Sequence, residues 1–428
     1  MPEKTNAASG TGASSAKPGS SSAAPYGAGS KTNPTTVPGP GVPGSPSTPG
    51  APAGSAAPKS PIVFGSIGTD SGILGEILVS ALHGAKAWAA DVNARGGLNG
   101  HPVRIVFGDD GGDPGRALSL AKGMVEQQGV IAFYMEHGPG TFQAVEPYAK
   151  QNNIPVIGSS NSNVTSARSP ITFVVGPAAE FGLVWTQVLP LLVYAPDKHK
   201  VSLMYCRESP SCKAGRDIIV AQAGKLGLQV VHEAQVSLTQ PDFTAEMLAA
   251  KSAGAEAIIP FVDNNTVIRM SRSSKRQGYT PVYSAQYASH DERFLKNGGA
   301  DIEGVLVGAS MPHWSSPKLN DYVAAMQRYV PGGIKASYGE LSWATGKLIE
   351  VISKDLPDKP TGADLIRGLY ALHGETLGGL VPPLTYRPGE GSDQNNHCTV
   401  ALRVENGKFV SKNGDEFTCE PGWKPTHK

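Results

Sequence analysis

The chain has 428 residues, a formal net charge of +1 at pH 7 and only 17% charged residues. A nearly neutral chain without a basic stripe interleaved with aromatic residues argues against a nucleic-acid partner and against any polyanion or polycation. Its length exceeds what one hydrophobic core usually supports, so we expect two folded domains.

Residues 1–60 differ in composition from the rest of the chain. They are mainly Gly, Ser, Pro, Ala and Thr, and they contain no Leu, Ile or Phe. Such a segment cannot bury enough apolar surface to offset the entropy of ordering its backbone. We therefore expect a disordered tether that is semi-stiff where its prolines cluster.

The segment 62–115 has the pattern of a strand, a helix and a second strand. An apolar run at 62–67 ends in a loop of Gly, Ser, Thr and Asp, and a second apolar run occupies 103–108. Apolar residues between them recur at spacings of three and four, and Gly96-Gly97 supplies the left-handed residue that ends a helix. This βαβ unit places its first loop at the carboxyl edge of a parallel sheet, where open α/β folds bind ligands.

Apolar runs alternate with helical patterns through most of the remaining chain, which predicts parallel sheets covered by helices on both faces. Two sheets of five to six strands fit the length better than one wide sheet. The expected strands are 130–134, 155–158, 201–205, 228–232, 257–262, 281–284 and 305–307, and the expected helices include 114–127, 141–151, 214–226 and 243–253. Asn406-Gly407, between two further apolar runs, is a strong hairpin signal.

Two runs in the opening segment carry a resemblance to a known family. Residues 91–100 read D-V-N-A-R-G-G-L-N-G, and residues 105–110 read I-V-F-G-D-D, with Asp113-Pro114 shortly after. Together with the preceding strand and its loop, they resemble type I periplasmic binding proteins, and most of all the branched-chain amino-acid (Leu/Ile/Val) receptors of ABC importers. The similarity extends over most of residues 61–410.

The resemblance implies an α/β fold of two Rossmann-like lobes, each with a parallel central sheet, joined by a hinge of three crossings. We expect lobe 1 to comprise residues 61–177 and 309–383, and lobe 2 to comprise residues 178–308 and 384–428. In this division the segment 379–386 forms the strand that re-enters lobe 2.

The same resemblance implies an extracytoplasmic solute-binding protein that binds a small polar or amino-acid-like ligand between its lobes and delivers it to an ABC permease. A sensor of the same fold that reports to a signalling partner is the alternative, and a surface scaffold whose cleft has lost its ligand is a third hypothesis. We expect a monomer that meets the membrane only through a lipid anchor or the permease. Because the sequence has no catalytic motif, we expect no enzyme activity, cofactor or bound metal, and we interpret Asp109-Asp110 as structural.

The amino-terminal region bears on the expected location. No apolar stretch is long enough to span a membrane, and the start has no signal-peptide core. A tether of this composition is what a surface lipoprotein has after its lipidated cysteine, but no cysteine precedes it here. We therefore expect that the signal sequence and anchor were removed or lie upstream, and a cytoplasmic protein with a floppy tail is the alternative.

The four cysteines fall in two close pairs, Cys206 with Cys212 and Cys398 with Cys419. Each pair spans a polar, turn-rich segment, and an even count with close pairing indicates two local disulfides formed in an oxidising compartment. By the loop-entropy argument they contribute roughly 2 and 3 kcal/mol. Zinc does not fit the spacing, since no C-x-x-C occurs, whereas reduced structural thiols remain an open alternative.

In lobe 1 the resemblance places ligand contacts on loops that follow the strands. The run 159–163 occupies the position where the family binds the ligand's carboxylate and amino group. Ser160 is expected to offer backbone donors and Ser162 its hydroxyl, with Asn161 between them, because small side chains let a ligand approach main-chain N–H groups. A hydroxyl-rich turn that binds nothing is the alternative. Gly138 stands where the family has a ligand-binding serine, and it has no hydroxyl to offer.

In lobe 2 the sequence departs from the family's pattern. The family has an acidic residue that neutralises the ligand's ammonium at the position of Gln286, which Tyr287 follows. Burying an ammonium without a counter-charge costs several kcal/mol. Either the ligand is not an ordinary amino acid or another carboxylate replaces the lost one. Asp263 is our candidate for that carboxylate, and a cap for the helix that follows it is the alternative.

Three further positions bear on the expected pocket. Ile77 stands where a tyrosine often faces the ligand in the family, and Cys212 stands where the family has the tyrosine of a Y-G-x-G run. Ala178, just after the first expected crossing between the lobes, is a further expected ligand contact. The pocket is therefore expected to differ in shape from that of the amino-acid receptors, with Tyr205, Tyr283 and Tyr287 available as substitute walls; Tyr287 is the one we expect to contact the ligand.

Overall fold

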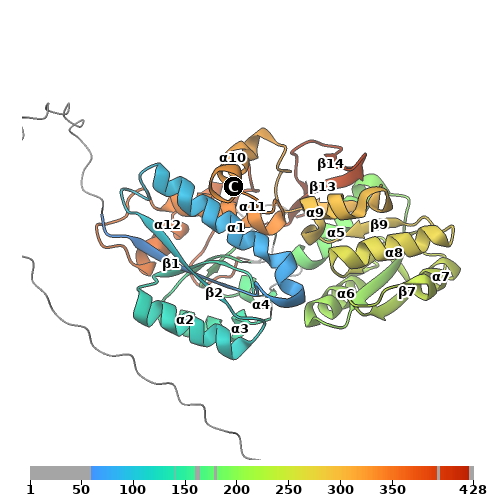
Figure 1. Cartoon of the computed structure of the whole chain (residues 1–428), viewed down its shortest axis with the longest axis horizontal. Coiled ribbons are helices and arrows are strands. Elements are labelled where there is room, and N and C mark those ends of the chain that lie inside the picture. The colour runs from blue at the N-terminus through green and yellow to red at the C-terminus, as the bar shows by residue number, and fades with distance from the viewer. Residues whose placement is uncertain (1–58, 139, 160–163, 178–180, 393–395, 424–428) are drawn as a thin grey trace, which may run out of the picture. The chain divides into compact units, whose positions relative to one another are not determined.

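Two mostly parallel sheets, each covered by helices, form the framework of the chain (Figure 1). The structure is a computed structural model that describes residues 59–138, 140–159, 164–177, 181–392 and 396–423. The tether expected at residues 1–60 lies outside the described residues except for Lys59 and Ser60. The α/β class that the alternating pattern predicts is confirmed by the order of helices and strands.

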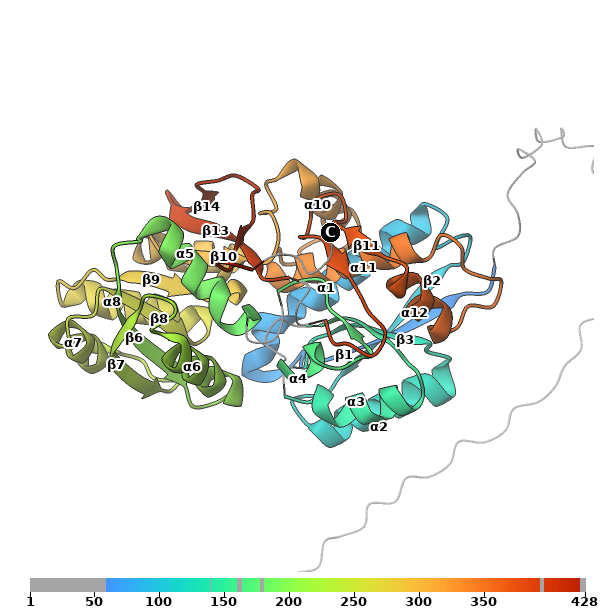
Figure 2. The ribbon, with the colours of Figure 1, turned by 180° about the vertical axis from the view of Figure 1, so that it is seen from behind.

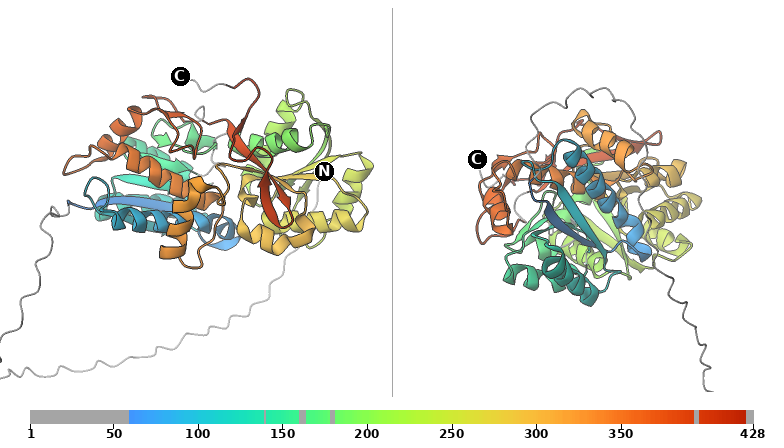
Figure 3. Two further views of the ribbon diagram at one scale, coloured as in Figure 1. Left: turned by 90° about the horizontal axis from the view of Figure 1, so that it is seen from above. Right: turned by 60° about the vertical axis from the view of Figure 1, so that its left-hand side comes forward.

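The first sheet contains five parallel strands in the order β2-β1-β3-β4-β5. They are β1 (Ile62–Gly68), β2 (Val103–Asp109), β3 (Ala132–Glu136), β4 (Val156–Ser159) and β5 (Thr172–Phe173). Helices α2 (Pro114–Gln128) and α3 (Phe142–Gln151) cover one face, and α1 (Gly72–Ala94) and α11 (Ser337–Ile352) cover the other (Figure 1; Figure 3, right). Helices α4 (Val164–Ala167), α10 (Asn320–Tyr329) and α12 (Gly362–Tyr370) complete this part of the chain.

The second sheet contains eight strands, seven of them in the order β14-β13-β10-β9-β8-β6-β7. Strands β6 to β10 run parallel, whereas β13 and β14 are antiparallel additions and β15 pairs with β13. The strands are β6 (Lys200–Cys206), β7 (Gln229–Val236), β8 (Ala257–Phe261), β9 (Val282–Ala285), β10 (Leu306–Ala309), β13 (Cys398–Glu405), β14 (Lys408–Ser411) and β15 (Thr418–Cys419). The sheet is wider than expected because the C-terminal residues add three strands to it.

Helices cover both faces of the second sheet as well. Helix α5 (Thr186–Tyr194), entered through the π-helical turn η1 (Phe181–Trp185), lies across one face together with α6 (Pro210–Gln222), as Figure 2 shows. Helices α7 (Thr244–Ser252), α8 (Asn264–Arg276) and α9 (Glu292–Gly298) cover the other face. The short turns η2 (Tyr287–Ser289), η3 (Gly299–Ile302) and η4 (Pro317–Leu319) lie in the connections. Coverage on both faces explains why β8 is a continuous apolar run with every residue buried.

Helix α6 begins at Pro210 rather than at residue 214, where the periodicity predicted its start. Ser209 caps the helix, because its hydroxyl accepts the N–H of Ser211, and the proline occupies the first turn, where its missing N–H costs nothing. The early start places Cys212 in the first turn of α6, close to the end of β6.

The segment 379–386 does not enter the second sheet, so that expectation is wrong. Leu384-Thr385 (β12) pairs antiparallel with His373–Glu375 (β11) in a small separate sheet. Leu384 and Tyr386 are buried among residues of α1 and α11, and the Tyr386 hydroxyl donates a hydrogen bond to the carbonyl of Val174. The apolar side chains of this segment therefore complete the core beside the first sheet, and β13 is the strand that joins the second sheet.

The parts of the chain built on the first and the second sheet are lobe 1 and lobe 2, respectively. The hydroxyl of Ser392 donates to the carbonyl of Thr172 in β5, which ties this later segment to lobe 1. We therefore propose that the third crossing follows Ser392, and our other lobe boundaries remain a proposal.

The hairpin predicted at Asn406-Gly407 is confirmed. Glu405 pairs with Lys408 across a two-residue turn, and both turn residues have positive φ, 52° for Asn406 and 71° for Gly407. Turns of this kind match the right-handed twist of the strands they join, and asparagine and glycine adopt the left-handed conformation at low cost. This hairpin gives the second sheet its antiparallel edge.

Helices α1 and α11 approach closely because glycines lie at their contact. A Cβ atom on Gly84 would lie 2.2 Å from the carbonyl oxygen of Gly339, and one on Gly346 would lie 2.3 Å from the Trp88 ring. Trp88 is fully buried and stacks on Tyr134 of β3, with ring centroids 5.1 Å apart. The contact thus packs a helix from late in the chain against the opening βαβ unit.

We expect Gly84→Ala to destabilise the protein by about 1–3 kcal/mol, because the added methyl group must push two helix backbones apart. Gly123→Ala in α2 is the matched control, since a Cβ atom there meets no atom within 4 Å. The control should gain up to about 1 kcal/mol because alanine lowers the backbone entropy of the unfolded chain. Chemical denaturation measures both variants, and equal stabilities would contradict the close helix contact.

Candidate functional site

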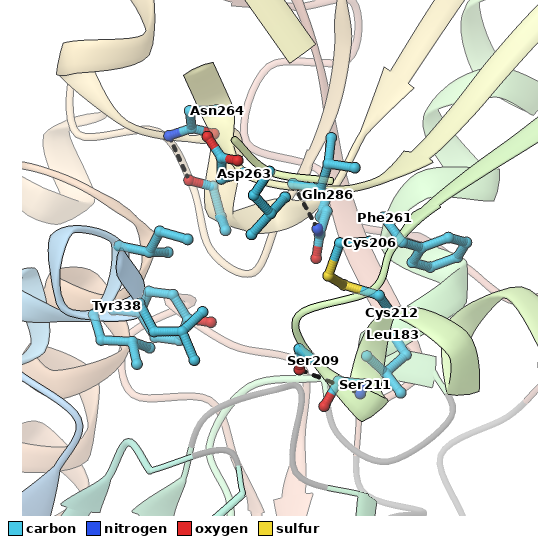
Figure 4. Close-up of a pocket in the computed structure, with 16 residues that line it drawn as sticks. Leu183, Cys206, Ser209, Ser211, Cys212, Phe261, Asp263, Asn264, Gln286 and Tyr338 are labelled. Carbon is cyan, nitrogen blue, oxygen red and sulfur yellow. Dashed lines mark hydrogen bonds between the residues drawn. A yellow bond between two sulfur atoms is a disulfide. The ribbon is translucent and has the colours of Figure 1, made fainter. Parts of the chain in front are cut away.

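A cavity with about 710 Å³ of empty space, partly open to solvent, lies between lobe 1 helices and the strand ends of lobe 2 (Figure 4). Lobe 1 contributes Leu74, Ile77 and Leu78 of α1 and Tyr338 of α11. Lobe 2 contributes residues that mostly end or follow its strands: Leu183, Cys206, Ser209, Ser211, Cys212, Leu238, Phe261, Val262, Asp263, Asn264, Gln286 and Ala288. In Figure 4, Tyr338 faces the disulfide across the cavity.

The topology of the second sheet explains why these residues meet. Strands β6, β8 and β9 are parallel, so their carboxyl ends lie at one edge of the sheet. Helices α6 and α8 begin at the same edge, where Ser209 and Asp263 cap them. Residues far apart in the sequence are thereby brought to one cavity wall.

Both predicted disulfides are present, Cys206–Cys212 and Cys398–Cys419. The first joins the end of β6 to the first turn of α6, and both of its cysteines line the cavity (Figure 4). The second joins β13 to β15, and neither of its cysteines lines the cavity. A disulfide in a cavity wall presents a polarisable, mainly apolar surface to a ligand.

Asp263 lines the cavity and caps α8 at the same time. Its Oδ1 accepts the N–H groups of Asn265 at 2.8 Å and Thr266 at 3.1 Å, and its Oδ2 accepts the hydroxyl of Thr266 at 2.6 Å. A carboxylate is favoured at this place because the N-terminus of a helix carries unpaired N–H groups and a positive dipole end. The capping alternative is therefore observed, and the role of Asp263 as a counter-charge for a ligand remains a prediction.

Gln286 and Tyr287 face in different directions. The Nε2 group of Gln286, which lines the cavity, donates to the carbonyl of Val262 at 2.9 Å. Tyr287 is only 1% exposed and lies in the core of lobe 1, where its hydroxyl is hydrogen-bonded to that of Tyr338 at 2.6 Å. Among the described residues around the cavity, Tyr287 therefore supports the wall from behind, and Tyr338 forms part of its surface.

Ile77 lines this cavity and a second, more polar one beside it. The second cavity has about 770 Å³ of empty space and shares Ile77, Leu238, Asp263 and Asn264 with the first. It also contains two arginines. Arg293 forms an ion pair with Asp291 and donates to the carbonyl of Glu76 at 2.6 Å, whereas Arg269 donates to the carbonyl of Leu238 at 2.7 Å.

Gly138 has a steric reason to be glycine. A Cβ atom there would lie 2.1 Å from Oγ1 of Thr141 and 2.7 Å from Oδ2 of Asp110. Its N–H donates to Oε1 of Glu136 at 2.6 Å. Gly138 is not among the described residues that line the two cavities, and a serine at this position would require Thr141 to move.

The loops at the edge of the first sheet are tied together by buried polar groups. Asp110 is fully buried and accepts the hydroxyls of Thr69 at 2.7 Å and Thr141 at 2.6 Å, which supports its structural interpretation. Both ring nitrogens of His137 face acceptors, the carbonyl of Met135 and the carboxylate of Asp70. Burial acts against a charge on this ring, but the hydrogen bond and charge of Asp70 outweigh it and raise the pKa of His137.

Four of the predicted ligand contacts, Ser160, Asn161, Ser162 and Ala178, lie outside the described residues. Of the remaining five, Ile77, Asp263 and Gln286 meet at the cavity, and Gly138 and Tyr287 do not line it. The apolar lining from Leu74, Leu183, Leu238 and Phe261 was not predicted from the sequence. Leu238 and Phe261 could have been predicted to line the cavity, because they lie close to the ends of strands β7 and β8.

The part of the chain that the structure describes shows no group of three or more His, Cys, Asp and Glu side chains able to hold a metal ion. Within the same residues, no helix combines the length and the apolar character that a membrane span requires.

The fold and the interlobe cavity define a class of solute-binding proteins, and sequence comparison agrees. The profile of the family described as "Periplasmic binding protein" matches residues 61–408. The chain therefore belongs to this family, and within it to the type I proteins that resemble the Leu/Ile/Val receptors. The family is a solute-binding family that works outside the cytoplasm and is not a family of enzymes.

Particular relatives are similar over most of the chain. An amino acid binding protein from Pseudomonas aeruginosa is 26% identical over 280 residues, which cover 64% of this chain and 73% of the relative. A branched-chain amino acid ABC transporter protein from Thermus thermophilus, solved with bound valine, has a TM-score of 0.71 at 17% identity and covers 86% of this chain and 98% of its own. A solute-binding protein from Rhodopseudomonas palustris, solved with 4-hydroxybenzoate, has a TM-score of 0.66 at 19% identity and covers 85% and 98%.

A cluster of buried ionisable groups lies where the two lobes meet. Glu340 of α11 is fully buried, and neither of its carboxylate oxygens has a hydrogen-bond partner among the described residues. Oε2 lies 3.2 Å from Nδ1 of His290, whose Nε2 is 2.7 Å from Nδ1 of His313. Burial raises the pKa of Glu340 and lowers the pKa of His290 to about 3. We infer that both groups are uncharged in the folded protein at neutral pH.

We expect the Tm of Glu340→Gln to rise relative to the Tm of the wild type as the pH rises from 5 to 8. Because the pKa of Glu340 is raised, the folded state keeps a proton that the unfolded chain releases above the ordinary value of 4.5. The wild type therefore loses up to about 1.4 kcal/mol per pH unit that the variant, which does not titrate, retains. Thermal unfolding across this pH range measures the difference.

Glu350→Gln on the same helix is the matched control and should behave in the opposite way. Burial acts to raise the pKa of Glu350, but hydrogen bonds from Arg95 and Lys347 hold it below its usual value. The Glu350 carboxylate therefore stabilises the fold above pH 4.5, and this stabilisation is lost as the pH falls. Relative to the wild type, Glu350→Gln should thus have a larger decrease in Tm at pH 8 than at pH 4. A constant Tm difference for Glu340→Gln would instead mean that Glu340 is ionised.

Proposed function

We propose that the protein is the extracytoplasmic solute-binding component of an ABC importer, which binds a small polar or amino-acid-like ligand in the interlobe cavity and delivers it to a membrane permease. The observation that carries the proposal is the cavity, whose walls come from α1 and α11 on one side and from strand ends of lobe 2 on the other. The ligands named for the relatives, amino acids, valine and 4-hydroxybenzoate, support a small organic solute.

A cavity with walls from two lobes couples binding to shape. A ligand that contacts both walls favours the closed arrangement, which a permease can distinguish from the open one. Moving such an equilibrium from 1:99 to 99:1 requires about 5.5 kcal/mol of differential affinity. Burial of an apolar ligand body together with a few hydrogen bonds is of this size.

We infer further that the protein acts as a monomer held at the membrane by a lipid anchor. The Gly/Ser/Pro/Ala composition of residues 1–60 supports a spacer between an anchor and a folded receptor. The large apolar side chains exposed in the described residues, Val220, Leu248 and Val410, come from three different elements. Light scattering tests the monomer, and mass spectrometry of the protein isolated from membranes tests the anchor.

A thermal-shift screen over amino acids, hydroxy acids, amides, aromatic acids and sulfonates tests the binding function. A true ligand at one hundred times its Kd stabilises the folded state by about 2.7 kcal/mol. Ile77→Arg should abolish this shift, because it fills the cavity from the lobe 1 side, whereas the exposed Val220→Arg should keep it. Stabilisation by no compound, or an unchanged shift in Ile77→Arg, would contradict the proposal.

Uptake experiments separate an importer from a sensor. Cells that lack the gene should lose uptake of the ligand found in the screen and regain it with the wild-type gene. Unchanged uptake combined with a lost cellular response to the ligand would favour the sensor instead.

The two disulfides allow a controlled test of whether the cavity wall contributes to ligand binding, because only Cys206–Cys212 lines the cavity. Replacing Cys206 and Cys212 by serine should weaken ligand binding by about tenfold, since it releases the first turn of α6 and removes an apolar surface. Replacing Cys398 and Cys419 by serine should leave the affinity within about twofold. By loop entropy, both double variants should lose about 2–3 kcal/mol of folding stability. Isothermal titration calorimetry compares the affinities, and an equal loss in both variants would mean that the effect is one of stability alone.

A further inference from the structure

The cavity wall combines a large apolar surface with polar groups that carry little free charge. Leu183, Leu238 and Phe261 lie on the lobe 2 side with the disulfide, and Leu74 and Ile77 lie opposite. These side chains would present mainly apolar atoms to a bound molecule. The polar groups that remain determine which ligand end can be buried there, because an unpaired polar or charged group is costly in such surroundings.

Gln286 offers an acceptor without a formal charge. The carbonyl of Val262 can only accept a hydrogen bond, so the amide nitrogen of Gln286 must be the group that faces it, at 2.9 Å. The amide oxygen is consequently directed to the other side, toward the cavity, as Figure 4 shows. A hydroxyl or an N–H of a ligand can donate to this oxygen, but the oxygen supplies no counter-charge for an ammonium.

Asp263, a carboxylate in the wall, is already compensated. Two backbone N–H groups at the start of α8 and the hydroxyl of Thr266 donate to it. The hydroxyl oxygen of Thr266 in turn accepts from the guanidinium of Arg269 at 2.7 Å. A positive helix end and a cation linked through one hydroxyl therefore offset the charge of Asp263 before any ligand arrives.

The adjoining polar cavity is lined by two arginines, Arg269 and Arg293, and by the carboxylates of Glu76 and Asp263. Arg269 lines it and forms no ion pair within the described part of the chain, and its buried Nε lacks a hydrogen-bond partner among those residues. Arg293, which also lines it, is paired with Asp291. An ammonium brought into the main cavity would lie near Arg269, and Asp263, the one carboxylate among the described residues that line that cavity, is already compensated.

We propose that the ligand has an apolar body that packs against the Cys206–Cys212 disulfide and presents a hydroxyl or another uncharged donor, not an ammonium, to Gln286. This inference rests on the proposed function, since it names the class of solute bound in that cavity. Its chemistry is that of apolar hydroxy acids and phenols, as opposed to amino acids of the same shape.

Matched pairs of compounds test the proposal directly. The probes are L-leucine with L-2-hydroxy-4-methylpentanoate, and L-phenylalanine with L-3-phenyllactate. The members of a pair differ only in ammonium against hydroxyl, so the comparison does not depend on how the carboxylate is held. In calorimetry at pH 7.5, the hydroxy acid should bind at least about tenfold more tightly than the amino acid in each pair that binds.

Variants of Gln286 test the named contact. Gln286→Glu should reverse the preference within a pair by adding a carboxylate. Gln286→Met, whose thioether sulfur is only a weak acceptor, should weaken hydroxy-acid binding by about tenfold. Gln277→Glu, at the far end of α8, carries the same change of charge outside the cavity and should leave the preference unchanged. Circular dichroism checks that each variant is folded, and Gln286→Met keeps the test open if Gln286→Glu does not fold.

The outcomes separate this inference from the proposed function. An amino acid that binds as tightly as its hydroxy acid would overturn the inference and leave the solute-binding function intact. If neither pair binds, the wider screen decides: hits that are apolar and uncharged or anionic support the inference, and hits that carry an ammonium overturn it. Binding of no compound at all would remove the proposed function and the inference with it.

Discussion

The contacts between residues 286–293 and the start of α11 join the strand ends of lobe 2 to the helices of lobe 1 beside the cavity. Tyr287 leaves the end of β9 and buries its ring in the lobe 1 core, with its hydroxyl 2.6 Å from that of Tyr338. A few residues later, the backbones of Asp291 and Ala336 form an isolated antiparallel β-bridge, and the N–H of Ser337 donates to the carbonyl of His290 at 2.9 Å. Gln286 and Tyr338 stand beside this junction, so the two walls of the cavity are positioned by one set of bonds.

The charges around the junction and the cavity are mostly satisfied within the protein. Asp110 accepts two threonine hydroxyls and His137 contacts Asp70, while burial raises the pKa of Glu340 and lowers the pKa of His290, which disfavours the charged form of each. Each arrangement reduces the free energy that burial of a charge would otherwise cost. What remains on the described wall is a mainly apolar surface with one compensated carboxylate, Asp263, and this is the surface on which the proposed ligand class is based.

Sequence reasoning located the elements well where local chemistry decides the structure. The disulfide pairs are close in sequence, and Asn406-Gly407 needs only its own backbone preference, so both predictions are confirmed. Strand positions followed from apolar runs because both faces of each sheet are buried. The apolar periodicity of α6 begins several residues after its true start. The local signal for that start is Ser209-Pro210, a capping serine followed by a proline in the first turn.

The remaining errors come from long-range packing. The segment 379–386 is apolar enough for either sheet, and only the tertiary partners of Leu384 and Tyr386 decide that it stays with lobe 1. For the same reason the cavity could be placed at the strand ends, but its apolar lining could not be enumerated. Asp263 shows the limit most clearly, since a residue that both caps a helix and faces a cavity satisfies two interpretations that sequence reasoning treats as rivals.

Helix α1 extends from the cavity to the far side of lobe 1. It has 23 residues and is therefore roughly 35 Å long at 1.5 Å per residue. Leu74 and Ile77 near its start face the cavity, Gly84 meets α11 backbone to backbone at its middle, and Arg95 just beyond its end pairs with Glu350 of α11 at 2.9 Å. A helix clamped at its middle and end cannot bend or roll independently. A displacement imposed at Ile77 would therefore move α1 and α11 together, so a ligand that pushed on this residue would shift both helices as one layer.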